Sequence, residues 1–446
     1  MGNIVFKRKI YKKLLDWKNR SAGKTALLIE GARRVGKSTI VEAFAKAEYD
    51  SYLLIDFAFA PQTIHEMFAD LSDLDFFFLQ LQLHYGVNLV KDKSLIIFDE
   101  VQFCPLARQA IKKLVADGRY HYIETGSLIS IKKKTKDILI PSEERKLTMY
   151  PMDYEEFMWA LNEQNTVPLL KQAFDNKKRL GDALNRQMMR TFRLYMLVGG
   201  MPQAVLAYLD HNNFQAIDEV KRDILDLYEE DFYKINPSGK IAALFDAIPS
   251  ELSKHTSGYQ VSSVLPQDRR SSLTEEFSEL IASKTVLAAY HATDPSVGLT
   301  ISRDITNFRL YLSDTGLMVT QIFRDKSFTD NVIYKKLLSD KLPVNLGILY
   351  ENMVAQTLAA NGHALHYYTF ENDKGKRNYE IDFLISMNDK ICPIEVKSSG
   401  YKAHKSLDVF SQKFSHRILR RYVIYTKDLH QENGVIYLPA YLAQFL

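Results

Sequence analysis

One glycine-rich segment, GARRVGKS at residues 31–38, constrains the fold of this chain more than any other. It fits the pattern G-x-x-x-x-G-K-[ST], follows the apolar run TALLIE and precedes the helix-like run TIVEAFAKA. The pattern requires a strand, a tight loop and a helix N-terminus in this order, because the loop must turn its backbone N–H groups towards phosphate. We therefore predict a nucleotide-binding loop shaped by Gly31 and Gly36.

The residues that follow the second glycine predict the ligand. Lys37 would reach the β- and γ-phosphates of ATP, and the Ser38 hydroxyl would ligate Mg²⁺. Arg34 and Thr39 are further candidates for nucleotide binding, although for Arg33 and Arg34 simple exposure to solvent is an equal alternative.

Four short apolar runs, at 25–31, 51–57, 94–100 and 121–127, end in polar residues or glycine and alternate with helical stretches. This pattern predicts a parallel sheet with crossover helices, which places ligands at the carboxyl ends of its strands. SLIIFDE thus brings Asp99 to the site to hold Mg²⁺ through water, and Glu100 to activate the hydrolytic water. Thr125 or Ser127 would sense the γ-phosphate or cap the strand end. No arginine finger is assigned, and Arg145 is a candidate by position alone.

Length and composition indicate a soluble protein of several domains. A chain of 446 residues is too long to fold around a single hydrophobic core. Its two cysteines lie far apart in the sequence, and no apolar run is long enough to span a membrane. We expect a cytoplasmic protein with no membrane partner. Helices followed by a β-hairpin at 236–330 suggest a winged-helix module. The net charge of +4 permits nucleic-acid binding but equally describes an ordinary solvated surface.

Several segments together resemble one ATPase family. GARRVGKST, LIIFDEVQ, ETGS, MYPMDYEEFMWAL, LVGGMP, FRLYLSDTGLM, NLGILYENMVAQTL, EIDFLI and PIEVKSS are similar to bacterial and archaeal ATPases of the AAA+ superfamily that carry a C-terminal domain of unknown function. The likeness covers most of the chain and is weakest at about 250–300. It implies an α/β fold with a P-loop AAA+ core at 1–160, a helical lid at 161–235, a winged-helix-like module at 236–330 and an α/β domain at 331–446.

The C-terminal domain resembles the restriction-endonuclease-like PD-(D/E)xK fold. YEIDFLIS carries Asp382 and ICPIEVKS carries Glu395 and Lys397, on two strands that the MNDK turn would join. The resemblance implies that Asp382, Glu395 and the helical Glu351 ligate Mg²⁺ while Lys397 orients a water nucleophile. Gln356 and Ser406 could position water or phosphate. The alternative is a row of partly exposed ion pairs without catalysis.

The expected function is that of an ATP-hydrolysing protein acting on nucleic acid, with DNA the first candidate. One alternative is a signalling switch whose C-terminal domain binds a partner without cleaving it. Another is an assembly scaffold regulated by ATP. A homo-oligomer is left open.

Overall fold

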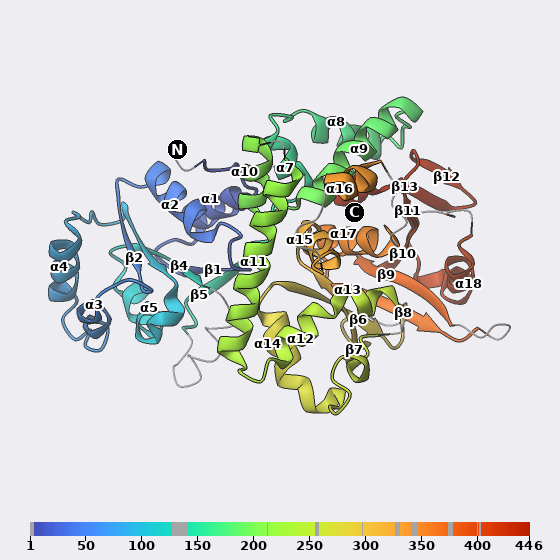
Figure 1. Cartoon of the computed structure of the whole chain (residues 1–446). Helices are drawn as coiled ribbons and strands as arrows, with labels where there is room; N and C mark the ends of the chain where they lie inside the picture. The colour runs from blue at the N-terminus through green and yellow to red at the C-terminus, as the bar shows by residue number, and fades with distance from the viewer. Residues whose placement is uncertain are drawn as a thin grey trace. The chain divides into compact units, whose positions relative to one another are not determined.

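The computed structural model divides the chain into two compact units, Met1–Tyr150 with Ala282–Lys284, and Pro151–Ile281 with Thr285–Leu446. Each unit has its own β-sheet (Figure 1). The structure describes residues 4–126, 141–211, 213–254, 258–296, 298–325, 331–339, 346–372, 378–398, 400 and 403–446. Within these ranges, no helix has both the length and the apolar character needed to cross a membrane.

The first unit contains the predicted parallel sheet. Its strands lie in the order β5-β1-β4-β3-β2, and every pairing is parallel. Their bounds are β1 Ala26–Glu30, β2 Ser51–Asp56, β3 Ser94–Asp99, β4 His121–Gly126 and β5 Glu144–Thr148. Since the strands are parallel, their carboxyl ends meet at one edge, and the loop after β1 lies there beside the ends of β3 and β4.

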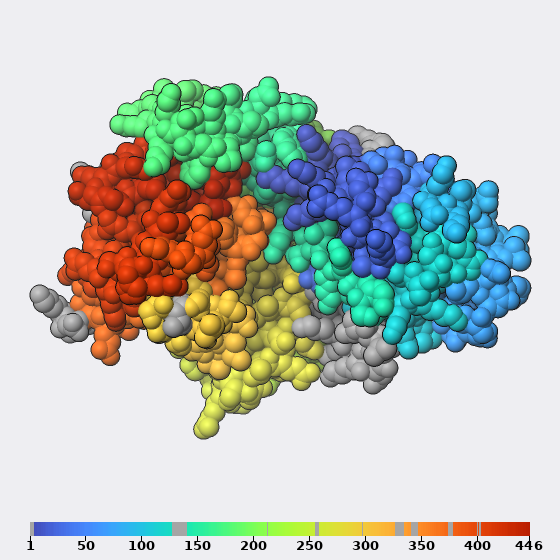
Figure 2. Space-filling view, turned by 180° about the vertical axis from the view of Figure 1, so that it is seen from behind, coloured from blue at the N-terminus to red at the C-terminus, as the bar shows by residue number. Residues whose placement is uncertain are grey.

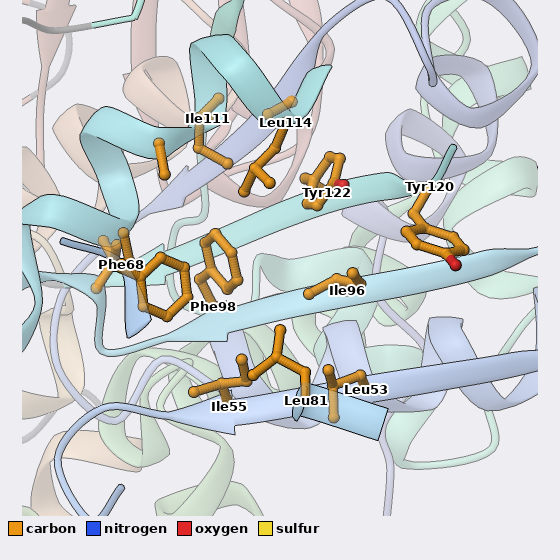
Figure 3. Packing of buried hydrophobic residues seen from close by; sticks show 14 of the residues in the cluster. Leu53, Ile55, Phe68, Leu81, Ile96, Phe98, Ile111, Leu114, Tyr120 and Tyr122 are labelled. Carbon is orange, nitrogen blue, oxygen red and sulfur yellow. The ribbon is translucent and has the colours of Figure 1, made fainter. Parts of the chain in front are cut away.

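Helices cover both faces of this sheet: α1 Ile10–Arg20, α2 Lys37–Glu48, α3 Gln62–Met67, α4 Leu74–Tyr85 and α5 Pro105–Asp117. In β3, Leu95 and Ile97 belong to the core shared with α1 and α2, whereas Ile96 and Phe98 belong to the core with α3 to α5. Figure 3 shows the second core, in which Phe68 and Phe98 meet edge to face at 5.4 Å. Burial on both faces explains why β1, β3 and β4 read as continuous apolar runs, whereas β5 at the sheet edge is polar and partly exposed.

The first part of the second unit is helical, as the sequence predicted for residues 161–235. The helices before its sheet are α7 Tyr154–Ala160, α8 Thr166–Asp175, α9 Asp182–Val198, α10 Pro202–His211, α11 Phe214–Ile235, α12 Lys240–Asp246, α13 Ile248–Ser253 and α14 Thr274–Ala282. Later helices are α15 Thr315–Ile322, α16 Asn331–Leu338, α17 Leu346–Ala360 and α18 Lys405–Lys413.

The second sheet has eight strands in the order β12-β13-β11-β10-β9-β8-β6-β7. They are β6 Val286–Ala292, β7 Arg303–Leu312, β8 His366–Phe370, β9 Tyr379–Met387, β10 Lys390–Val396, β11 Arg421–Tyr425, β12 His430–Glu432 and β13 Val435–Pro439. The hairpin β6–β7, predicted as part of a separate winged-helix module, pairs through β6 with β8. The hairpin therefore belongs to the same sheet as the C-terminal strands, and the boundary predicted at residue 331 does not separate two sheets.

A close junction of backbone segments organises the second unit around Asp314. This buried carboxylate accepts hydrogen bonds from Leu317 N at 2.9 Å and from Gly200 N at 2.5 Å. A Cβ on Gly200 would lie 2.1 Å from the carbonyl oxygen of Met152, and a Cβ on Gly316 would lie 2.5 Å from Gly199 Cα. Only glycine allows this approach, so the segments YPMD, VGGMP and SDTG meet here.

Replacing Gly200 by alanine should destabilise the second unit by about 3 kcal/mol or more, because the new methyl group overlaps a backbone oxygen that cannot move independently. Chemical denaturation of the full chain measures the effect. The matched control is Gly298→Ala, where the added Cβ meets only Ile301 Cδ1 at 3.8 Å. Equal stability of the two variants would contradict this account of the junction.

Candidate functional site

The loop between β1 and α2 has the geometry predicted from GARRVGKS. A Cβ on Gly31 would lie 2.3 Å from Met149 O, so a larger residue is excluded by close backbone contact. Gly36 has φ +97°, a left-handed conformation that favours glycine, and it directly precedes α2. The loop therefore leads into the helix N-terminus, whose N–H groups and dipole attract anions.

Lys37 is buried beneath this loop with its charge held by backbone oxygens. Its Nζ donates to Gly31 O at 2.9 Å and to Ala32 O at 3.0 Å, and the residue is 7% exposed. Burial lowers the pKa of Lys37, while the nearby Glu100 and Asp99 carboxylates act in the opposite direction. A buried ammonium without a salt-bridged counterion is costly, so a phosphate bound at the loop would supply favourable charge.

Asp99 gathers two hydroxyl groups at the carboxyl end of β3. Ser38 Oγ donates to Asp99 Oδ1 at 2.8 Å, and Thr125 Oγ1 donates to the same oxygen. The hydroxyl and carboxylate oxygens of Ser38 and Asp99 are hard ligands of the kind Mg²⁺ prefers, so the residues fit the predicted ion. Thr125, predicted as a γ-phosphate sensor, holds the Asp99 carboxylate in this structure; its sensing role stays a prediction.

Glu100 follows Asp99 in a left-handed backbone conformation, with φ +50°. Such a conformation is uncommon for a residue other than glycine and is concentrated at functional turns. The Gln102 side-chain amide donates to Glu100 Oε2 and fixes the carboxylate. Burial is the main reason why the pKa of Glu100 is raised, and Asp99 and Asp56 also raise it. A carboxylate with raised proton affinity is suited to general-base work.

Two residues of this site were not singled out from the sequence. Asp56 ends β2 and pairs in register with Asp99 of β3, which adds a second carboxylate to the edge. Gln102 is buried and bonds Glu100. A polar end on the apolar run SYLLID signalled Asp56, but only strand order places it beside Asp99. The DEVQ segment does not by itself predict that the Gln102 side chain donates to Glu100.

The remaining predictions in the first unit have mixed outcomes. Arg34 and Thr39 are exposed at the loop and at the start of α2, where nucleotide contact stays a prediction. Arg145 was a candidate arginine finger, but it pairs with Leu27 near the amino end of β1 and donates to Ser21 Oγ at 2.9 Å. It lies at the opposite end of the strands from the phosphate loop of its own chain. Ser127 falls outside the described residues.

A second polar site lies on the sheet of the second unit. As predicted, β9 and β10 form an antiparallel hairpin that carries Asp382 on one strand and Glu395 on the next. Asp382 Oδ2 accepts from Val396 N at 2.7 Å. Glu395 Oε2 lies 3.2 Å from Lys397 Nζ, and its Oε1 accepts from Leu407 N at 3.0 Å. The hairpin therefore brings two carboxylates and a lysine together.

Electrostatics link this hairpin to Glu351 on α17. Burial raises the pKa of Glu351 to about 7, with Arg309 opposing and Glu380 adding to the shift. The pKa of Asp382 is raised well above its ordinary value by burial and then by Glu351 and the other carboxylates. Burial also raises the pKa of Glu395. Interacting buried carboxyl groups of this kind are a feature of functional sites, although ion-pair networks also produce them.

Within the described ranges, no three His, Cys, Asp or Glu side chains are arranged to hold a metal ion. The metal-binding role of Glu351, Asp382 and Glu395 therefore stays a prediction. Gln356, predicted to position water or phosphate, instead accepts from Thr315 N and Oγ1 at 2.9 Å and donates to Tyr195 OH at 3.1 Å. Its bonds join α17 to the Asp314 junction. Ser406 Oγ accepts a long hydrogen bond from Glu380 N at 3.4 Å.

Comparisons with family models divide the chain in three. Residues 23–158 match an AAA domain, residues 189–327 match a domain of unknown function, and residues 346–442 match another domain of unknown function. The first unit carries an AAA-type P-loop domain. The matched residues 23–158 include the phosphate loop, Asp99, Glu100 and Thr125, which are the residues that the structure brings together at the edge of the first sheet. A comparison with curated proteins gave no match.

Two solved structures show distant likeness. The Walker-type ATPase of Pyrococcus abyssi is 15% identical over 71% of this chain and 96% of its own, with a TM-score of 0.41. A signal transduction ATPase with numerous domains from Pyrococcus horikoshii is 11% identical over 79% of this chain and 48% of its own, with a TM-score of 0.27. Scores this low define neither the fold nor the function of this chain.

The raised pKa of Glu351 predicts how its charge affects stability. Between its ordinary pKa, near 4.5, and about 7, the unfolded chain releases a proton that the folded chain retains, so Glu351 lowers stability as pH rises through this window. Glu351→Gln should gain up to about 3 kcal/mol relative to wild type between pH 4.5 and pH 8. Urea denaturation at both pH values measures it. Glu432→Gln, on exposed β12, is the control. A difference independent of pH would contradict the assignment.

Proposed function

We propose that this chain binds and hydrolyses ATP and uses the cycle to act on nucleic acid. The observation that supports hydrolysis is the arrangement at one edge of the first sheet. There, the phosphate loop with Lys37, the Ser38–Asp99 pair and the fixed Glu100 come together from three separate segments. The AAA domain match over residues 23–158 supports the same activity.

Each side chain has a defined task in this proposal. Lys37 and the loop N–H groups bind the phosphates and hold them in line for attack. Ser38 and Asp99 would hold Mg²⁺, which when bound neutralises negative charge on the phosphate oxygens. Glu100, held by Gln102, would take a proton from the attacking water, and its pKa, raised by burial, favours that transfer.

The test separates binding from hydrolysis. Glu100→Gln should retain ATP affinity and lose turnover by about 100-fold or more, because the amide cannot accept the proton. Lys37→Ala is the matched comparison and should lose affinity itself. Fluorescent-nucleotide titration and steady-state phosphate release measure the two properties on the full chain. Unchanged turnover in Glu100→Gln would remove this residue as the base, and normal turnover in Lys37→Ala would reject the phosphate loop.

A second candidate activity, cleavage of DNA by the C-terminal domain, is favoured by the grouping of Asp382, Glu395 and Lys397. Burial tends to lower the pKa of Lys397, but Glu395 and Asp382 outweigh it and the net shift is upward. The lysine therefore stays protonated, suited to holding a phosphate or a water nucleophile. If the domain does not cleave, the alternatives are a switch whose C-terminal domain binds a partner, or a scaffold that assembles with ATP independently of nucleic acid.

Cleavage is tested with single- and double-stranded DNA, with and without Mg²⁺ and ATP. Asp382→Asn should abolish product formation while ATP turnover continues, because the changed residue lies outside the nucleotide site. Asp389→Asn, exposed in the turn between β9 and β10, is the matched control. Cleavage that survives Asp382→Asn would reject this site as the catalytic centre. ATP-dependent assembly that ignores DNA would favour the scaffold.

A further inference from the structure

A cleft of about 940 Å³ lies within the second unit, and none of its described lining residues belongs to β9 or β10, the strands that carry Asp382 and Glu395. Helices α9 and α16 and the residues that follow β11 form it. The described lining residues are Asp182, Asn185, Arg186, Met189, Arg190, Arg193, Lys335, Leu338, Ser339, Thr426 and Lys427. Figures 1 and 2 show α9, in green, against the red C-terminal segment, where Asn185 Nδ2 donates to Thr426 O at 3.3 Å.

The lining is strongly cationic. Arg186, Arg190 and Arg193 follow one another at i, i+4 and i+7 on α9, so they share one face of the helix. Lys335 of α16 and Lys427 after β11 add two more positive charges, and Asp182 is the one acidic residue among the described lining residues. The arginine row extends about 10 Å along the helix, at 1.5 Å per residue.

Arg193 Nε donates to Tyr350 OH at 3.1 Å, but Arg186, Arg190 and Lys335 differ from other cations of the same unit. Arg222 Nε lies 2.7 Å from Asp218, and Arg309 Nη1 lies 2.7 Å from Glu380. By contrast, among the described residues no ion pair joins Arg186, Arg190 or Lys335 to a carboxylate. Like charges at i, i+4 repel one another and destabilise a helix. An anionic ligand along the row would remove that repulsion.

The rest of the lining narrows the ligand class. None of the described lining residues is aromatic, so the cleft offers no ring on which a base could stack. Asn185, which could read a base edge, is buried: its Nδ2 donates to Thr426 O and its Oδ1 accepts from Tyr441 OH at 3.0 Å. What remains is a row of guanidinium and ammonium groups, and guanidinium groups bind phosphate in bidentate fashion.

We propose that this cleft binds the phosphate backbone of a nucleic-acid strand without reading its base sequence. The charge spacing fits such a ligand, since a strand carries one negative charge per nucleotide at regular intervals and the row of about 10 Å can meet more than one phosphate. The occupant is a strand rather than a small phosphate because the cations extend along the helix and across to α16 instead of surrounding one point. The site shares its partner class with the proposed function but uses none of the residues that ATP hydrolysis or cleavage requires.

Fluorescence anisotropy with a labelled single-stranded oligothymidylate tests the proposal on the full chain, in EDTA and without nucleotide. Under these conditions neither ATP hydrolysis nor metal-dependent cleavage contributes. Arg190→Gln combined with Lys335→Gln should weaken binding at least about 10-fold. The slope of log affinity against log salt should fall in magnitude by about 1.4, because two phosphate contacts are lost from a single strand.

The chain offers a matched control one residue away. Lys336 is exposed on the same helix as Lys335 but does not line the cleft. Lys336→Gln should bind within about twofold of wild type. Thermal unfolding of each variant, with midpoints expected at or slightly above that of the wild type, shows that the fold is retained.

The inference would be overturned if the wild type did not bind, if Lys336→Gln and the double variant were weakened equally, or if binding strongly preferred one oligonucleotide sequence. Equal displacement of the oligonucleotide by tripolyphosphate and by an unlabelled strand would show a small-phosphate site and also reject it. The outcome is separable from the proposed function, because Arg190→Gln with Lys335→Gln should keep wild-type ATP turnover, and a failure of ATP turnover in the wild type would leave the binding result unchanged.

Discussion

The second unit depends on the burial of one carboxylate, Asp314, between segments far apart in the chain. Burial alone raises the pKa of Asp314, and donation from the N–H groups of Gly200, Leu317 and Gly316 opposes that shift. Close by, the buried Lys221 donates to Leu197 O at 2.8 Å and Gly316 O at 3.1 Å, and its pKa is lowered by burial to about 8. Such a buried network stabilises the fold only when every polar group in it has a hydrogen-bond partner.

This junction also positions both polar sites of the unit. Asn352 exchanges hydrogen bonds with Leu312 N and O at 2.8 Å and 3.0 Å, which fixes α17 and hence Glu351 relative to the sheet. Helix α9, which carries the arginine row, ends at the glycine pair that Asp314 holds. The carboxylate cluster and the cationic cleft thus share one rigid support, as binding groups that need fixed geometry require.

The first unit also buries a charged group, Lys37, with backbone carbonyls as partners, and holds a second one, Glu100, in an uncommon backbone conformation. Both arrangements oppose folding: burial disfavours the lysine charge, and the backbone conformation of Glu100 is strained. The surrounding parallel sheet, buried on both faces, supplies the apolar contacts that offset these terms.

The sequence by itself determined the phosphate loop, four of the five parallel strands of the first unit and the hairpin that joins Asp382 to Glu395, but not the edge strand β5. Each depends on local spacing: glycines within one loop, apolar runs of strand length, and side chains that alternate along a strand.

Tertiary structure decided which residues from distant parts of the chain lie side by side. Strand order brought Asp56 beside Asp99, and the register of β1 with β5 set Arg145 near the amino end of β5, away from the phosphate loop of its own chain. Pairing of β6 with β8 joined the predicted winged-helix hairpin to the C-terminal sheet. Helix packing gave Gln356, predicted to position water or phosphate, a hydrogen bond to Thr315 beside Asp314. It also gathered Arg190, Lys335 and Lys427 into one cleft. These outcomes rest on contacts between residues far apart in the chain, which a local pattern does not specify.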